Sequence, residues 1–244
     1  MKKIEYVALK YYNSCISEEC LYVGMLFNNL TDNERTFVSI KNFRRLAVFD
    51  DDVNIDFFKD YLKSIKDEVE ANVFNYDKEF VLKDYIRPFT NELKFSKITT
   101  VETDEPDFIE NICKLYLKYD YDKKERLTKE TEKRYIQRVL KSSNIPFTRE
   151  PISGKYNEQI KFDFVTDKYV IKVFDFDNKD LTRIISNVKS WAYNAREMKE
   201  ERKTIFLYDS DILGSEEFEI IKSILSEDAY KVLPVDRGVE YLTA

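Results

Sequence analysis

One β-hairpin constrains the fold of this chain more than any other stretch. Its arms are residues 161–165 and 169–174, and both are rich in the aromatic and β-branched residues that are typical of half-buried strands. With the turn at Asp167 and Lys168, antiparallel counting places Asp163 opposite Lys172 on one face of the hairpin. A helical pattern at 128–140 precedes the hairpin, and a long amphipathic pattern at 181–195 follows it.

Alternating elements continue to the C-terminal end of the sequence. Residues 203–209 form an apolar strand pattern, 218–225 a helical one, and 230–235 a last short strand. A strand, a crossover helix and a second strand in one sheet run parallel. The C-terminal half is therefore predicted to be an α/β domain with a mixed sheet.

The N-terminal half has a different pattern, which favours an α+β domain with an antiparallel meander. Strands are predicted at 4–12, 20–27 and 36–40. Further strands are predicted at 80–82 and 93–99, and a helix from 106 to 117. A core-facing helical stripe is predicted after the acidic run 50–52, and it contains Phe57, Phe58, Tyr61, Leu62 and Ile65.

The charged stretch 119–126 lacks an apolar period and marks the boundary between the two halves. We expect an N-terminal domain over 1–122 and a C-terminal domain over 123–244. With 43% hydrophobic and 35% charged residues, the composition is that of a soluble globular protein. No apolar run is long enough for a membrane span, and the first residues resemble a strand more than a signal peptide.

Missing residue types exclude several classes of site. The chain has no histidine, which excludes His-based triads and His-containing metal sites. Cys15, Cys20 and Cys113 show no Cys-x-x-Cys spacing, so neither a disulfide framework nor a zinc site is indicated and a cytoplasmic location is expected. Cys113 lies on an apolar helical face and is interpreted as a buried small side chain. The triplet 50–52 is interpreted as a solvated helix cap in preference to a metal site.

The net charge of −6 argues against a bulk attraction to nucleic acid. A local basic face is the alternative, formed by Arg183, Lys189 and Arg196, with Arg134, Arg138 and Lys141 from the preceding helix. Charged helix faces are more often simply solvated, and we favour that interpretation.

Three resemblances to known families rest on short motifs. The order of elements over 128–236 resembles the PD-(D/E)xK nuclease superfamily, which carries an Asp on one strand and Glu-x-Lys on the next. Glu19–Gly24 and Phe43–Leu46 resemble a bacterial family of unknown function with the motif Glu-Phe-x-Asn-Val-Gly, although Cys20 and Tyr22 depart from it. The fragments 162–164 and 190–196 are also similar to a second uncharacterised bacterial family.

The nuclease resemblance implies a metal site that is incomplete here. In active members the Asp and the Glu hold Mg²⁺ and the Lys activates water, so that Asp163 and Lys172 match. The Glu position holds Val170, which offers no oxygen ligand. A rearranged site would need Glu132 or Glu130 from the preceding helix, or Asp175. We favour a cross-strand ion pair between Asp163 and Lys172, and predict no cofactor unless a nuclease site with Mg²⁺ is retained.

These observations lead to one expected function and two alternatives. We expect a non-catalytic protein on a degenerate restriction-endonuclease-like scaffold that binds another protein. Its Lys- and Asn-rich, His-free composition is of a kind found in phages and mobile elements, where a role in defence or counter-defence is conceivable. The alternatives are a Mg²⁺-dependent nuclease that uses Asp163, Lys172 and Glu132, and a protein that binds nucleic acid without cleavage.

Overall fold

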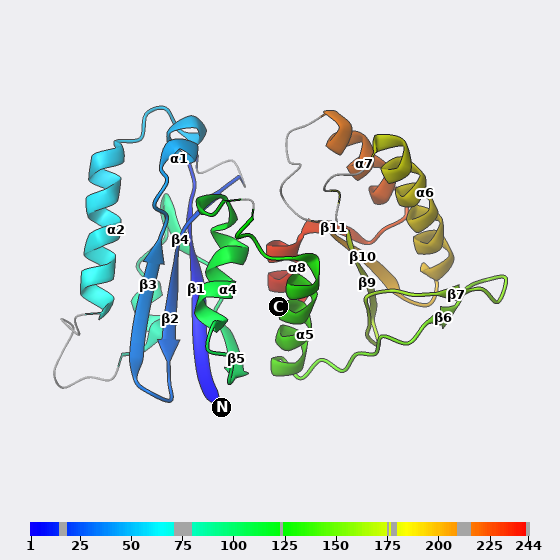
Figure 1. The fold of residues 1–244 in the computed structure, drawn as a ribbon, viewed down its shortest axis with the longest axis horizontal. Coiled ribbons are helices and arrows are strands. Elements are labelled where there is room, and N and C mark those ends of the chain that lie inside the picture. Colours follow the sequence, from blue (N-terminus) through cyan, green and yellow to red (C-terminus); the bar gives the residue numbers. More distant parts are fainter. Residues whose placement is uncertain are drawn as a thin grey trace. The chain divides into compact units, whose positions relative to one another are not determined.

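The computed structural model describes residues 1–14, 19–70, 80–122, 124–174, 176, 180–208 and 216–242. The chain divides into two compact units, Met1–Thr128 and Lys129–Ala244. The boundary predicted from sequence lies between residues 122 and 123, whereas this division falls at the start of a helix. Each unit contains its own sheet (Figure 1), and the architecture is mixed α and β in both.

The N-terminal unit is built on an antiparallel sheet. Its strands are β1 (Lys2–Tyr11), β2 (Leu21–Asn29), β3 (Glu34–Ser39), β4 (Leu93–Phe95) and β5 (Thr99–Thr103). The order is β3-β2-β1-β4, and β5 also pairs with β1. The predicted meander is therefore confirmed, with β1 at its centre.

Helices cover both faces of this sheet. Helix α2 (Ile55–Glu70) lies on one face and α4 (Phe108–Tyr116) on the other (Figure 1). Side chains along β1 alternate between the two faces of the sheet, which gives each face an apolar surface for a helix to cover. Val7 and Leu9 pack in the core that α2 covers. On the other face, the ring centroids of Tyr6 and of Phe108 in α4 are 6.0 Å apart. Shorter helices α1 (Arg44–Phe49), α3 (Leu82–Ile86) and the 3₁₀ turn η1 (Lys118–Asp120) complete the unit.

Gly24 marks an irregularity between the first two strands. The pairing of β1 with β2 shifts register between Leu9 and Lys10, opposite Gly24. A Cβ at this position would come within 2.6 Å of the Phe37 ring. The glycine is thus explained by a close strand contact.

Two local predictions for this unit are wrong. Leu82 begins α3 and is not part of a strand over 80–82. Of the helical stripe after residue 50, Phe58, Leu62 and Ile65 are buried, but Phe57 and Tyr61 are 69% and 38% exposed. The side chain of Asn54 caps α2 by accepting the Phe57 N–H, so the acidic run precedes the helix as a turn.

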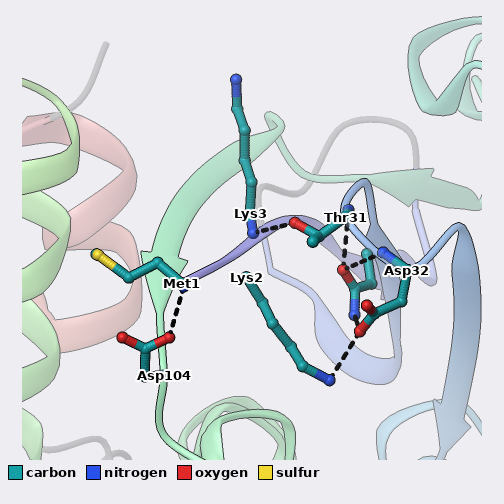
Figure 2. Close-up of polar contacts among 7 residues, drawn as sticks. Met1, Lys2, Lys3, Thr31, Asp32 and Asp104 are labelled. Atoms are coloured by element: carbon teal, nitrogen blue, oxygen red, sulfur yellow. Dashed lines mark hydrogen bonds and ion pairs between the residues drawn. The ribbon is translucent and has the colours of Figure 1, made fainter.

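A polar network holds the start of β1 to the β2–β3 turn (Figure 2). The Lys2 ammonium lies 2.8 Å from an Asp32 carboxylate oxygen, and the Lys3 N–H donates to Thr31 Oγ1 at 2.9 Å. Asn29 donates to the same Asp32 carboxylate, and with Lys2 it lowers the pKa of that group. The Met1 amine lies 2.9 Å from Asp104. The two ion pairs are exposed and contribute little to stability, whereas the Asn29 side chain is buried.

The C-terminal unit has a mixed sheet in the order β11-β10-β9-β8. Its strands are β8 (Phe164–Val165), β9 (Tyr169–Phe174), β10 (Lys203–Tyr208) and β11 (Lys231–Pro234), and a separate hairpin joins β6 (Ile152–Ser153) to β7 (Gln159–Ile160). β8 and β9 are antiparallel, whereas β9, β10 and β11 are parallel. The predicted mixed sheet is confirmed.

Helices lie on both faces of this sheet (Figure 1). Helices α6 (Leu181–Met198) and α7 (Glu216–Ser226) cover one face, and α5 (Lys129–Ser142) and α8 (Val235–Leu242) lie on the other. Asp180 caps α6 by accepting the N–H groups of Thr182 and Arg183. No described helix of either unit is long and apolar enough to cross a bilayer.

Candidate functional site: the Asp163 cluster

The β8–β9 hairpin positions Asp163 and Lys172 as the sequence predicts. Phe164 pairs with Ile171 and Val165 with Val170, and the Asp163 N–H donates to the Ile171 carbonyl at 2.9 Å. Thr166 closes the turn, since its hydroxyl accepts the Tyr169 N–H at 2.9 Å. Counting back from these pairs sets Asp163 opposite Lys172, which confirms the predicted register.

Asp163 is contacted by two ammonium groups and one backbone amide. Lys133 Nζ lies 2.6 Å from Asp163 Oδ1, and Lys172 Nζ lies 3.4 Å from Oδ2. The Val173 N–H donates to the same Oδ2 at 2.9 Å. Both carboxylate oxygens are therefore occupied. The Asp163 side chain is only 10% exposed, so these contacts are largely shielded from solvent. We call Asp163, Lys133 and Lys172 the Asp163 cluster.

The helix that was expected to bring a carboxylate brings a cation instead. Lys133 lies on α5, directly after Glu132, which is buried on the same helix. Glu130 Oε1 lies 3.9 Å from Lys133 Nζ, and the Glu130 side chain is 77% exposed. Glu130 is therefore a second, weak ion-pair partner of Lys133. Lys133 was not among the predicted site residues. A signal was present, since Lys133 is one residue from a predicted ligand on the same helix.

No set of metal ligands forms around Asp163 within the described residues. There, the one carboxylate triplet close enough to share an ion is Asp50, Asp51 and Asp52 of the other unit. Within that triplet, Asp50 accepts hydrogen bonds from the Tyr11 hydroxyl and the Asp52 N–H. Asp175, the remaining sequence candidate, lies outside the described residues.

Val170 is fully buried where the resemblance expects a glutamate. Its side chain has 0% exposure and packs with Phe162, Val165 and Met198. A carboxylate here would have to leave water for an apolar cluster, at a cost of several kcal/mol. The surroundings of Val170 are therefore adapted to an aliphatic side chain.

The charges of the cluster shift the pKa values of its members. Burial raises the pKa of Asp163, but the Lys133 and Val173 hydrogen bonds and the charges of both lysines outweigh it and leave the pKa below its usual value. Burial lowers the pKa of Lys172 despite the attraction of Asp163, and the charges of Lys133 and Lys161 add to this effect. Lys172 Nζ also lies 4.4 Å from the Trp191 ring centroid. Asp163 is thus held as a carboxylate.

The basic face that was considered as an alternative does not form one surface. Arg183, Lys189 and Arg196 are all exposed on α6, but at about 100° per residue Arg183 lies roughly 120–140° around the helix from the other two. Arg196 is engaged with Asp228 through Nε at 2.9 Å and its terminal nitrogen at 2.8 Å. Arg134, Arg138 and Lys141 do share a stripe of α5 by their spacing.

Cys113 is placed as the sequence predicts. It is 2% exposed on α4, and burial raises the pKa of its thiol to about 12. The thiolate that a nucleophile requires is therefore strongly disfavoured.

Comparison with protein-family models, with curated proteins and with solved structures gives no match for this chain.

Proposed function

We propose that this chain is a non-catalytic, macromolecule-binding protein whose C-terminal unit is a degenerate restriction-endonuclease-like scaffold. The observation that carries the proposal is the closure of Asp163 by Lys133, Lys172 and the Val173 N–H. A hard divalent cation needs several oxygen ligands at one point. At this point an ammonium group lies 2.6 Å from the carboxylate, and the second ligand position is the buried Val170.

The order of elements supports the nuclease-like ancestry. A helix, α5, precedes the β8–β9 hairpin, and α6 then crosses over to the parallel strand β10. The Asp and the Lys stand at opposed positions of the hairpin, as the resemblance requires. What has changed is the chemistry of the neighbours, because a lysine and a valine stand where a metal site needs oxygen.

A protein partner is supported by an exposed aromatic pair on the N-terminal unit. Phe57 and Tyr61 lie one turn apart on the solvent face of α2, and their rings stack with centroids 6.3 Å apart. Exposed aromatic side chains of this kind are enriched at the centres of protein interfaces. We propose that this pair, named the α2 aromatic pair, anchors the partner.

A plasmid-nicking assay with Mg²⁺ or Mn²⁺ tests the absence of catalysis. We expect the same background cleavage from the wild-type protein, Asp163→Ala and Lys172→Ala, at matched protein concentrations. Nicking by the wild-type protein that both substitutions abolish would establish a nuclease and overturn the proposal.

The α2 aromatic pair is tested by affinity capture of proteins from a host lysate. Phe57→Ser with Tyr61→Ser is expected to lose a protein that the wild-type chain retains, because the two rings supply the apolar contact. Ile220→Ser is the matched control, since Ile220 is 50% exposed on α7 of the other unit. Equal capture by the double variant and the wild type would show that this pair is not the interface.

A further inference from the structure

Three tyrosine rings and two lysines form a cluster at one end of the C-terminal sheet. Tyr169 begins β9, Tyr230 precedes β11, and Tyr241 lies on α8. The ring centroid of Tyr169 lies 6.2 Å from the centroid of Tyr230 and 6.2 Å from that of Tyr241. The centroids of Tyr230 and Tyr241 are 6.4 Å apart. Lys203 Nζ lies 4.4 Å from the Tyr230 ring and Lys231 Nζ 4.8 Å from the Tyr241 ring. We call this set the tyrosine–lysine surface.

Backbone hydrogen bonds of the sheet hold these residues in place. Lys203 is the register partner of Tyr169 in the parallel β9–β10 pair, and its N–H donates to the Lys168 carbonyl at 3.0 Å. The Tyr230 N–H donates to the Thr204 carbonyl at 2.8 Å. The Tyr241 hydroxyl donates to the Tyr230 hydroxyl at 3.2 Å. The rings are therefore ordered before any partner arrives, which reduces the entropy lost on binding.

The surface is both aromatic and basic. Tyr230 is 44% exposed, Lys203 over its ring is also exposed, and Tyr169, Lys231 and Tyr241 are half-buried. Asp167 in the adjoining turn is an exposed acidic neighbour. The hydrogen bond from Tyr241 and the charges of Lys203 and Lys231 lower the pKa of Tyr230.

We propose that the tyrosine–lysine surface binds single-stranded nucleic acid, with bases on the tyrosine rings and phosphates on Lys203 and Lys231. Stacking on aromatic rings beside basic side chains is the usual way in which proteins hold single strands without reading sequence. A duplex keeps its bases stacked on each other, so it offers these rings no base face.

The site is independent of the α2 aromatic pair and of the Asp163 cluster, so its failure would leave the proposed function untouched.

Fluorescence anisotropy of a labelled oligo(dT) of about 12 nucleotides, titrated with the full chain at low salt, tests the proposal. Tyr230→Leu is expected to weaken binding by about 5- to 150-fold, the effect of losing one stacked base, whereas Tyr230→Phe keeps the ring and the affinity. Lys203→Gln with Lys231→Gln is expected to reduce the slope of log affinity against log salt by about 1.4, because two phosphate contacts are lost.

Matched controls separate this surface from other tyrosines and lysines. Tyr156→Leu removes an exposed tyrosine of the β6–β7 hairpin that also has a lysine over its ring, and Lys189→Gln removes an exposed lysine of α6. Both are expected to bind as the wild type does, and all variants are checked for wild-type circular dichroism. Failure of the wild-type chain to bind the oligonucleotide, tighter binding of the same sequence as a duplex, or equal losses in the controls would overturn the proposal.

Discussion

The Asp163 cluster and the tyrosine–lysine surface both contain two lysines, but the lysines have different partners and different exposure. In the first, Lys133 and Lys172 are about 20% exposed or less and face a carboxylate. In the second, Lys203 and Lys231 lie over tyrosine rings that solvent reaches. The charge of a lysine that is paired with a buried carboxylate is neutralised within the protein. A lysine over an exposed ring has no such counter-charge and can bind an anionic partner. In this unit, binding is therefore expected where charge is open, and not where the nuclease resemblance places the chemistry.

The largest effect is expected from placing a carboxylate at Val170, in the apolar cluster with Phe162, Val165 and Met198. Val170→Glu should lower the free energy of unfolding by about 3–5 kcal/mol, because an unpaired charge enters an apolar site with 0% exposure. Val170→Thr, which has a similar shape, should lose about 1–3 kcal/mol. Urea unfolding measures both. If Mn²⁺ restored the stability of Val170→Glu, the scaffold would still offer a metal site and the contrast between the two clusters would weaken.

Removing the shared carboxylate is expected to have the next largest effect. Asp163→Asn leaves the ammonium groups of Lys133 and Lys172 without their shared carboxylate at low exposure, and should cost about 3 kcal/mol in free energy of unfolding. Combining it with Lys133→Met should recover part of that loss, since the unpaired cation is removed. A matched control is Asp56→Asn in the exposed pair with Lys59, for which a much smaller loss is expected. Equal losses in the two single variants would show that the Asp163 cluster is no more important to the fold than a surface pair.

The pH dependence of the free energy of unfolding at acidic pH also tests the ion pairs of Asp163. The pKa of Asp163 is lower in the folded chain than its ordinary value, so its contribution is complete above the unfolded pKa and is lost as pH falls through the folded pKa. The stability difference between the wild type and Asp163→Asn should therefore shrink on acidification below about pH 4. Urea unfolding across this range measures it, and a difference that stays constant to the lowest pH would contradict the ionised pair.

The open surface should show a spectroscopic effect with little change in stability. The Tyr241 hydrogen bond and the lysine charges lower the pKa of Tyr230, whereas the Tyr230 and Tyr169 hydrogen bonds raise the pKa of Tyr241. In an alkaline absorbance titration, Tyr230→Phe should remove the earliest tyrosinate signal. Lys203→Gln should instead move that signal to higher pH. An unchanged early phase in Tyr230→Phe would show that Tyr230 is not the perturbed group.

The strand register and strand directions of the C-terminal unit were predictable, because they depend on short stretches of sequence. Strand alternation and a two-residue turn are enough to oppose Asp163 and Lys172, and a crossover helix makes β9 and β10 parallel. The partner on α5 was not predictable in the same way. Glu132 and Lys133 are neighbours in sequence, and which of them meets Asp163 depends on how the helix packs on the sheet.

The exposure of Phe57 and Tyr61 was missed for a related reason. The apolar residues of α2 follow two adjacent stripes, and only packing on the sheet selects the one with Phe58, Leu62 and Ile65. The tyrosine–lysine surface left no local pattern at all. Its rings come from β9, the approach to β11, and α8, a helix that the sequence analysis did not predict.

The most direct test of the closed Asp163 cluster is Mn²⁺ binding, followed by the electron paramagnetic resonance signal of the free ion. The wild-type protein, Asp163→Asn and Asp51→Asn are titrated in parallel, since Asp51 belongs to the exposed carboxylate triplet of the other unit. Because both oxygens of Asp163 are occupied, we expect Asp163→Asn to bind as much Mn²⁺ as the wild type. A saturable site that Asp163→Asn loses and Asp51→Asn keeps would show that Asp163 holds a metal ion and that the cluster is not closed.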